Sequence, residues 1–140
     1  MIYDSSALAA FFLNEEARPL VECALKNDSN ACTVDFGLVE VTNAIWKRWL
    51  ARKITTKQTM IIHAEIDLSL REEVLQVLSS VQLLKKAIQV SIRHKLSVYD
   101  SVFIAGCSRF RQRLVSLDER QKSLAGAENV KLFILAALEL

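Results

Sequence analysis

The chain has 140 residues, 51% of them hydrophobic, and its 18 Lys and Arg nearly balance its 16 Asp and Glu to give a formal charge of +2. A chain of this length buries roughly two thirds of its unfolded surface, so it needs no disulfide or structural metal to hold a core. The sequence therefore predicts one globular domain over residues 1–140, and its charge excludes a strongly polybasic nucleic-acid binder.

The number and spacing of the cysteines and the length of the apolar stretches indicate in which cellular compartment the protein works. The three cysteines, at positions 23, 32 and 107, form no CxxC pair, and an odd count argues against a secreted disulfide framework. The apolar stretch at 7–13 is far shorter than the ~20 residues that cross a bilayer, and no basic segment precedes it. We therefore expect a cytoplasmic protein with no membrane association.

The first half of the chain predicts two strands and four helices. A strand over 1–4 ends at Asp4 and is followed by helices over 7–13 and 17–26, a polar turn at 27–30 and a second strand over 31–34. A long helix over 36–52 and another from 55 or 56 to about 66 come next. In the longer helix an apolar stripe is expected to face the core; it consists of Leu38, Val41, Ile45 and Trp49.

The second half continues the alternation of strands and helices. Residues 67–75 are ambiguous between a short strand and the edge of a helix, and a helix from 79 or 80 to 94 follows, with Val81, Leu84, Ile88 and Ile92 at helical spacing. A helix over 102–109, a strand over 114–117, a short helix over 119–124 and a last strand over 130–135 complete the chain. The predicted class is α/β, with about four to five short, mostly parallel strands between two layers of helices.

Four acidic residues are placed to meet at one edge of this sheet. Asp4 and Asp118 each follow an apolar strand and precede a helix. This position lies at the carboxyl edge of the sheet, where open parallel sheets bind ligands. Asp100 precedes the 102–109 helix and projects toward the same edge under the usual crossover. Glu40 lies on the 36–52 helix, on a face directed away from the apolar stripe.

Each acid also has an ordinary role, because Asp at a strand-to-helix junction is a common N-cap and a lone helical Glu is usually solvated. Four carboxylates at one edge repel each other, however, and are tolerated when a cation neutralises them. Oxygen ligands of this kind favour Mg²⁺ or Mn²⁺, which can activate a water and stabilise the leaving oxygen in phosphodiester hydrolysis. The pattern predicts a metal-dependent hydrolytic site.

Other catalytic chemistries have little to build on. His63 and His94 have no His, Cys or acid partner at ligand spacing, which disfavours a Ser-His-Asp or Cys-His site. The three glycines, at positions 37, 106 and 126, stand alone, so no glycine-rich phosphate loop is present.

Four segments of the chain resemble the successive motifs of PIN-domain ribonucleases, in the same order. They are residues 2–6 (IYDSS), 39–47 (VEVTNAIWK), 96–101 (LSVYDS) and 114–118 (LVSLD). The likeness covers essentially the whole chain, and short single-domain members of this family are typically VapC-type toxins of prokaryotic toxin–antitoxin pairs. The resemblance implies a PIN-like three-layer fold and endoribonuclease activity.

Carried over residue by residue, the resemblance implies that the metal-binding and catalytic side chains are those of Asp4, Glu40, Asp100 and Asp118. It implies supporting roles for Ser6, Asn43 and Ser116. It further implies an Mg²⁺ or Mn²⁺ cofactor, an RNA substrate, a homodimer, and a cognate antitoxin whose C-terminal segment occupies the acidic groove. The sequence departs from some relatives at Gln121, where they carry a further acid, and this difference predicts that one ion is held firmly rather than two.

Basic and aromatic residues supply candidates for partner contacts. Those for RNA phosphates are Lys47, Arg109, Arg111, Arg113 and Arg120, although a solvated helix face is the ordinary role of such charges. Trp46, Trp49 and Leu50 either form an exposed apolar patch for a partner protein or pack in the core.

Two rival functions stay open. A non-catalytic PIN-like module that binds a basic peptide or RNA predicts weak metal binding and no turnover. Phosphoryl transfer on Asp4 is disfavoured, because Ser6 stands where a haloacid-dehalogenase-like DxD motif needs its second Asp.

Overall fold

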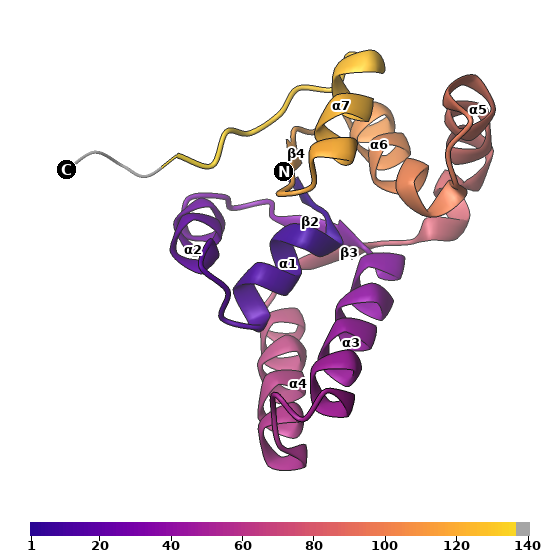
Figure 1. The fold of residues 1–140 in the computed structure, drawn as a ribbon. Coiled ribbons are helices and arrows are strands. Elements are labelled where there is room, and N and C mark those ends of the chain that lie inside the picture. Colours follow the sequence, from indigo (N-terminus) through magenta and orange to yellow (C-terminus); the bar gives the residue numbers. More distant parts are fainter. Residues whose placement is uncertain (137–140) are drawn as a thin grey trace.

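A four-stranded parallel sheet forms the centre of the computed structural model, which describes residues 1–136 (Figure 1). Its strands are β1 (Ile2–Tyr3), β2 (Cys32–Val34), β3 (Gln76–Leu78) and β4 (Leu114–Val115), in the spatial order β3-β2-β1-β4. In the register, Ile2 lies opposite both Cys32 and Leu114. The carboxyl ends of the two central strands, β1 and β2, and of β4 therefore meet at one edge.

Within residues 1–136, seven α-helices and one 3₁₀-helix connect and cover the strands. They are α1 (Ser5–Phe12), α2 (Arg18–Lys26), α3 (Asp35–Leu50), α4 (Thr56–Arg71), the 3₁₀-helix η1 (Ser80–Leu83), α5 (Leu84–His94), α6 (Val98–Phe110) and α7 (Glu119–Ala127). Local sequence explains several of their ends: Thr55 and Gln58 form a capping box at the start of α4, and Pro19 occupies the first turn of α2.

The sheet separates two hydrophobic clusters because successive side chains of a strand point to opposite faces. Tyr3 packs on one face with residues of α1 to α4, such as Leu8 and Val41. Ile2 packs on the other face with residues of η1, α5, α6 and α7, such as Phe103. Figure 1 shows the two groups of helices on either side of the sheet. The predicted three-layer α/β architecture is confirmed.

Two boundaries differ most from the sequence prediction. The first part of the ambiguous stretch at 67–75 completes α4, which runs to Arg71, and its remainder is a turn that leads into β3 at the edge of the sheet. The first two residues of β3 are exposed, so the strand carries no apolar alternation that would reveal it. Helix α6 begins at Val98 rather than at 102, because the side chain of Ser97 accepts a hydrogen bond from the backbone of Asp100 and caps the helix.

The predicted strand over 130–135 is wrong. In this region Leu132 makes a single parallel bridge to Leu114. The Leu114 N–H donates to the Lys131 carbonyl at 2.9 Å, and the Phe133 N–H donates to the Leu114 carbonyl at 2.8 Å. Strand β4 has only two residues, which leaves no length for a longer ladder. Residues 137–140 of the predicted domain lie outside the described part of the chain.

Two apolar stripes do not behave as simple core faces. In α3, Val41 and Ile45 are buried as predicted, whereas Trp49 is 43% exposed. In η1 and α5 the residues that face the sheet include Leu83, Ala87 and Val90, and the regularly spaced set Val81, Leu84, Ile88 and Ile92 points to solvent. Within residues 1–136, no helix combines the length and the apolar character needed to cross a membrane.

Candidate active site

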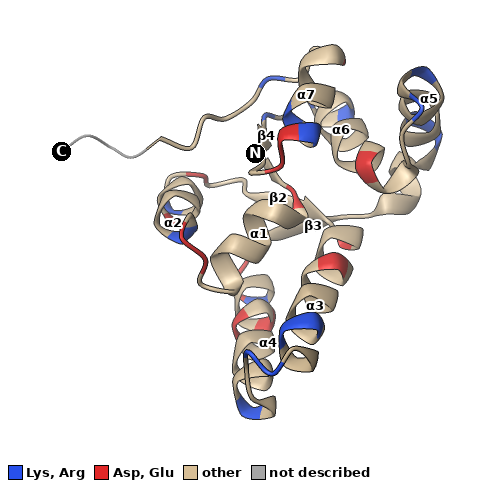
Figure 2. Cartoon of the chain, in the orientation of Figure 1, with Lys and Arg blue, Asp and Glu red and all other residues tan. Residues whose placement is uncertain are grey.

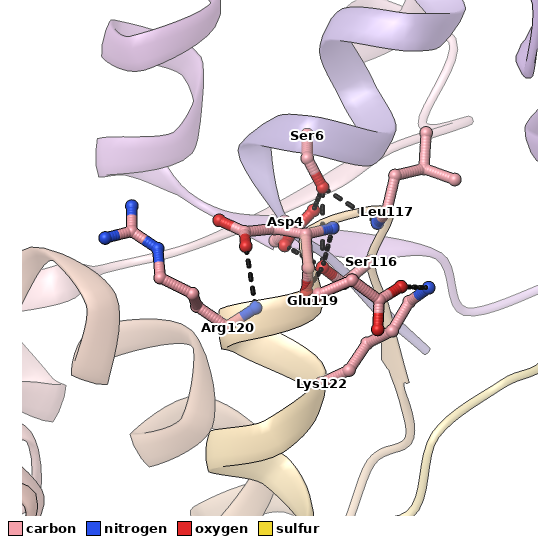
Figure 3. A network of polar contacts seen from close by, with 8 residues as sticks. Asp4, Ser6, Ser116, Leu117, Glu119, Arg120 and Lys122 are labelled. Atoms are coloured by element: carbon pink, nitrogen blue, oxygen red, sulfur yellow. Dashed lines mark hydrogen bonds and ion pairs between the residues drawn. The ribbon is translucent and has the colours of Figure 1, made fainter.

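Asp4 lies at the carboxyl end of β1 and is the N-cap of α1. Its side chain is 2% exposed, and the Oδ1 atom accepts hydrogen bonds from the Ser6 hydroxyl at 2.6 Å and the Ala7 N–H at 3.0 Å. Its Oδ2 atom accepts from the Ser116 hydroxyl at 2.5 Å. Figure 3 shows Ser6 and Ser116 directed at this carboxylate from two segments that are distant in sequence. Asp4 is therefore both a cap and a carboxylate fixed in orientation.

Asp118 occupies the equivalent place after β4 and is the N-cap of α7, where its Oδ1 accepts from the Arg120 N–H at 2.8 Å. The Asp118 N–H donates to the Ser116 hydroxyl at 3.0 Å, and the Leu117 N–H donates to the Ser6 hydroxyl at 2.9 Å. These contacts join the end of β4 to the start of α1 (Figure 3). The two aspartates thus sit at neighbouring strand ends, as the sequence predicts.

Glu40 and Asp100 approach the same edge from helices. Glu40 lies on α3, is partly buried, and its Oε1 accepts from the Ser5 hydroxyl at 2.9 Å. Asp100 lies in the first turn of α6, where its Oδ2 accepts from the Ser97 hydroxyl at 2.7 Å. Asp100 is therefore not the N-cap of its helix but a first-turn acid that contacts the cap residue Ser97, and Glu40 is not a fully solvated side chain.

One cavity of about 250 Å³ brings the four acids together, and its lining includes Asp4, Glu40, Asp100, Asp118, Tyr99 and Gln121. In Figure 2 the red segments at the starts of α3, α6 and α7 are drawn around the start of α1. This is the edge at which parallel sheets bind ligands.

Burial dominates the electrostatics of the cavity, and the neighbouring carboxylates add to its effect. Burial raises the pKa of Asp4 above its ordinary value, the hydrogen bonds from Ser116, Ser6 and Ala7 oppose the rise, and the negative charge of Asp118 adds to it. Burial also raises the pKa of Glu40, with smaller contributions from the charges of Asp4 and Asp100 in the same direction. A cation in the cavity would relieve both effects.

The donor set fits a hard divalent cation in type but does not form a closed cage. Among the residues that the structure describes, no three His, Cys, Asp or Glu side chains converge on one point as metal ligands. Mg²⁺ is usually held through one or two carboxylates and keeps several waters, so it does not require such convergence. The cavity offers carboxylate oxygens and room for water, so its residues fit a Mg²⁺ or Mn²⁺ ion.

The chain matches the PIN domain family over residues 1–127. It belongs to the PIN domain family. Ribonuclease VapC3 of Pyrobaculum aerophilum is 28% identical over 120 residues, which cover 86% of this chain and 90% of the relative.

Two solved structures share the fold of this PIN domain. VapC20 of Mycobacterium tuberculosis, described as a sarcin–ricin loop cleaving toxin, has a TM-score of 0.64 at 18% identity and covers 87% of this chain and 92% of its own. A toxin–antitoxin complex from Klebsiella pneumoniae has a TM-score of 0.61 at 16% identity over 86% of this chain and 88% of its own.

Three polar residues that line the cavity of the PIN domain were not among the predicted site residues. Ser5 holds Glu40, and its position directly after Asp4 was a usable signal. Gln121 is 6% exposed and donates from Nε2 to the Asp100 carbonyl at 2.8 Å, while its Oε1 atom is buried without a hydrogen-bond partner. Tyr99 lines the cavity and is 66% exposed.

Of the predicted supporting residues, Ser6 and Ser116 contact Asp4, whereas Asn43 is exposed and does not line the cavity. The supporting role of Asn43 was implied by the family resemblance, but its side chain is exposed and lies outside the cavity lining.

The predicted RNA-contacting residues are spread over the surface. Arg120 follows Asp118 in α7, and Lys47 lies two turns beyond Glu40 on α3. Arg111 and Arg113 precede β4 and so lie toward the sheet edge opposite the acids, and Arg109 donates to the Gln82 carbonyl at 2.7 Å. Arg109, Arg111 and Arg113 are close to β4 in sequence but do not line the cavity. They precede the strand, whereas the acids lie at its carboxyl end.

Proposed function

We propose that this PIN domain is a metal-dependent endoribonuclease and the toxin of a toxin–antitoxin pair. One observation carries the proposal: carboxylates from four separate elements line a single cavity at the carboxyl edge of the sheet. The ribonuclease name of the Pyrobaculum relative supports the activity. The Klebsiella toxin–antitoxin complex, which shares the fold, supports the biological setting.

In this proposal Asp4, Glu40, Asp100 and Asp118 would hold Mg²⁺ or Mn²⁺, and the bound ion would supply positive charge for the scissile phosphate and lower the pKa of a water for attack. Ser6 and Ser116 keep the Asp4 carboxylate in one orientation, and Ser5 does the same for Glu40. Arg120, in the first turn of α7 and two residues after Asp118, is the basic residue best placed to contact a phosphate.

Two exposed apolar surfaces support protein partners. A cleft of about 300 Å³ between α3 and α4 is lined by Trp46, Trp49 and Met60. It is our proposed contact for a further part of the antitoxin, whose C-terminal segment we expect in the acidic cavity. The solvent-facing stripe of η1 and α5, defined above, is our proposed homodimer contact, because a helix stripe is self-complementary about a two-fold axis. Three free thiols support a reducing compartment such as the cytoplasm.

One observation favours a second function, a non-catalytic binding module: within residues 1–136, no three candidate ligands converge. Phosphoryl transfer on Asp4 has less support, since this carboxylate is buried and both of its oxygens accept hydrogen bonds.

The test is a calorimetric titration of the partner-free protein with Mn²⁺, with RNA cleavage assayed on the same samples. Asp100→Asn is the informative variant, and Glu119→Gln is its control, because Glu119 is adjacent to Asp118 but its exposed side chain pairs with Lys122. We expect binding and cleavage in the wild type and the control, and loss of both in folded Asp100→Asn. A folded wild type that binds no Mn²⁺ and cleaves no RNA would leave the binding module as the better hypothesis.

A further inference from the structure

An exposed aromatic pair stands at the rim of the acidic cavity. The ring of Tyr99 stacks on that of Phe36 with centroids 5.0 Å apart and an interplanar angle of 13°. Phe36 packs against the core on the α5–α6 side of the sheet, whereas Tyr99 is 66% exposed. The pair therefore has a partly buried inner member, which packs against the core, and an outer member whose ring meets solvent.

Each ring of the pair lies on the same helix as one of the acids, Glu40 on α3 or Asp100 on α6. Phe36 precedes Glu40 by four residues on α3, so the two side chains share a helix face. Tyr99 is adjacent to Asp100 in the first turn of α6 and lines the same cavity. Figure 1 shows the beginnings of α3 and α6 close to each other at the carboxyl edge. The aromatic surface and the carboxylates consequently form one continuous site.

Core packing does not account for the outer ring. A tyrosine that keeps two thirds of its surface exposed contributes little hydrophobic burial. Stacking with Phe36 does fix the plane of the ring, and a preorganised aromatic plane next to a phosphate-processing site suits a flat, unpaired ligand. Unstacked nucleobases are bound in this way by proteins that contact single-stranded nucleic acid.

We propose that Tyr99 is a nucleobase-binding residue, on which a base of single-stranded RNA stacks while the neighbouring phosphate enters the acidic cavity. This inference rests on the proposed ribonuclease function and deepens it by assigning a substrate subsite. Every base has a π face, so the subsite selects an unpaired nucleotide rather than one base identity. Phe36 acts as a positioning residue that holds the Tyr99 ring in its plane.

The experiment measures binding of a short, labelled single-stranded RNA to the full chain, with Ca²⁺ in place of Mg²⁺ and the RNA checked for integrity. The same RNA is prepared with an abasic nucleotide at each position in turn. We expect one abasic position to weaken binding to the wild type about tenfold, and Tyr99→Ala to weaken binding of the parent RNA by a similar factor. Combining the two changes should cost little beyond either alone, because both remove the same stack.

Three variants separate stacking from a structural role. Tyr99→Phe keeps the ring and should bind like the wild type, whereas Tyr99→Leu covers Phe36 without a π face and should bind like Tyr99→Ala. If Tyr99→Ala fails to fold, the comparison of the Phe and Leu variants decides. Phe110→Ala, at the opposite end of α6, is the control for loss of an exposed aromatic and should leave binding unchanged.

The proposal is overturned if the wild type binds no RNA, if no abasic position matters, or if Tyr99→Leu binds like the wild type. Cleavage with Mn²⁺, measured separately, reports on the proposed function itself. Position-specific binding that depends on Tyr99 in a protein without cleavage would support the base subsite and overturn the nuclease.

Discussion

At Asp4, burial and hydrogen bonding act in opposite directions on one carboxylate, and burial is the larger effect because the pKa is raised. The folded protein therefore holds a proton on Asp4 more tightly than the unfolded chain does, and stability is lost as pH rises from the ordinary carboxyl pKa of about 4 through the raised value. The charged form of Asp4 destabilises the metal-free fold at neutral pH.

We expect Asp4→Asn to raise the melting temperature of the metal-free protein by a few degrees at pH 7, since Asn is also a good N-cap. The gain should disappear below about pH 4, where the wild-type carboxyl is protonated in both states. Thermal unfolding in EDTA across this pH range measures it. A lower melting temperature at every pH would show that the carboxylate is needed chiefly as a cap.

Gln121 places an unpartnered acceptor at the same cavity. Leaving a buried oxygen without a donor costs about 1–3 kcal/mol, and the bond from its Nε2 to the Asp100 carbonyl fixes the side chain in this position. We predict that Gln121→Glu tightens Mn²⁺ binding about tenfold by adding a carboxylate. Calorimetry of the two proteins tests this, and equal affinities would place residue 121 outside the reach of the ion.

At the scale of elements, Ser116 connects β4 and α7 to α1. Its hydroxyl donates to Asp4 and accepts from the Asp118 N–H, both in a largely buried setting. Ser116→Ala is expected to destabilise the protein by about 1–2 kcal/mol, because both partners lose a hydrogen bond. Urea denaturation provides the measurement. Ser69→Ala is the control, since Ser69 is on α4 and its hydroxyl contacts only the Glu65 carbonyl within its own helix, so it should have a much smaller effect.

Glu128, just after α7, joins that helix to the end of α5. It accepts two hydrogen bonds from Arg93, at 3.0 and 2.8 Å, and its Oε1 is 2.6 Å from His94 Nε2. The bond from Arg93 lowers the pKa of Glu128, so this contact contributes stability above the ordinary carboxyl pKa and loses it as pH falls through the lowered value.

We therefore expect Glu128→Gln to lower the melting temperature at pH 7 by no more than a few degrees, because Arg93 is exposed to solvent. The difference from the wild type should shrink below about pH 4. A difference that stays constant from pH 7 to pH 3 would contradict an electrostatic origin.

For the molecule as a whole, the solvent-facing stripe of η1 and α5 determines the expected assembly. Ile88 lies in the middle of this stripe and is 46% exposed. We predict that Ile88→Lys converts a dimer into a monomer, measured by light scattering after size exclusion. Ile134→Lys changes an exposed isoleucine elsewhere and should leave the dimer intact. A wild type that is already monomeric would contradict the proposed homodimer.

Much of the architecture followed from local patterns. Hydrophobic periodicity and capping residues placed the long helices to within a few residues, and the motif after each strand indicated Asp4 and Asp118. The edge strand β3 was missed because its exposed residues carry no alternation, and the strand at 130–135 was wrong because β4 is too short to pair with it. Strand length and edge position depend on the neighbouring chain segments, which a sequence window does not contain.

By itself, the sequence determined the α/β class, the family resemblance, and which four acids belong together. These three conclusions follow from residue types at fixed spacing. The spacing sets which segments form helices or strands and at which end of a strand each acid lies. Only the tertiary structure decided that Ser5 holds Glu40, that Tyr99 stacks on Phe36, and that Gln121 reaches the Asp100 carbonyl. Each of these contacts joins two elements, so it depends on how α1, α3, α6 and α7 pack against one sheet rather than on any local pattern.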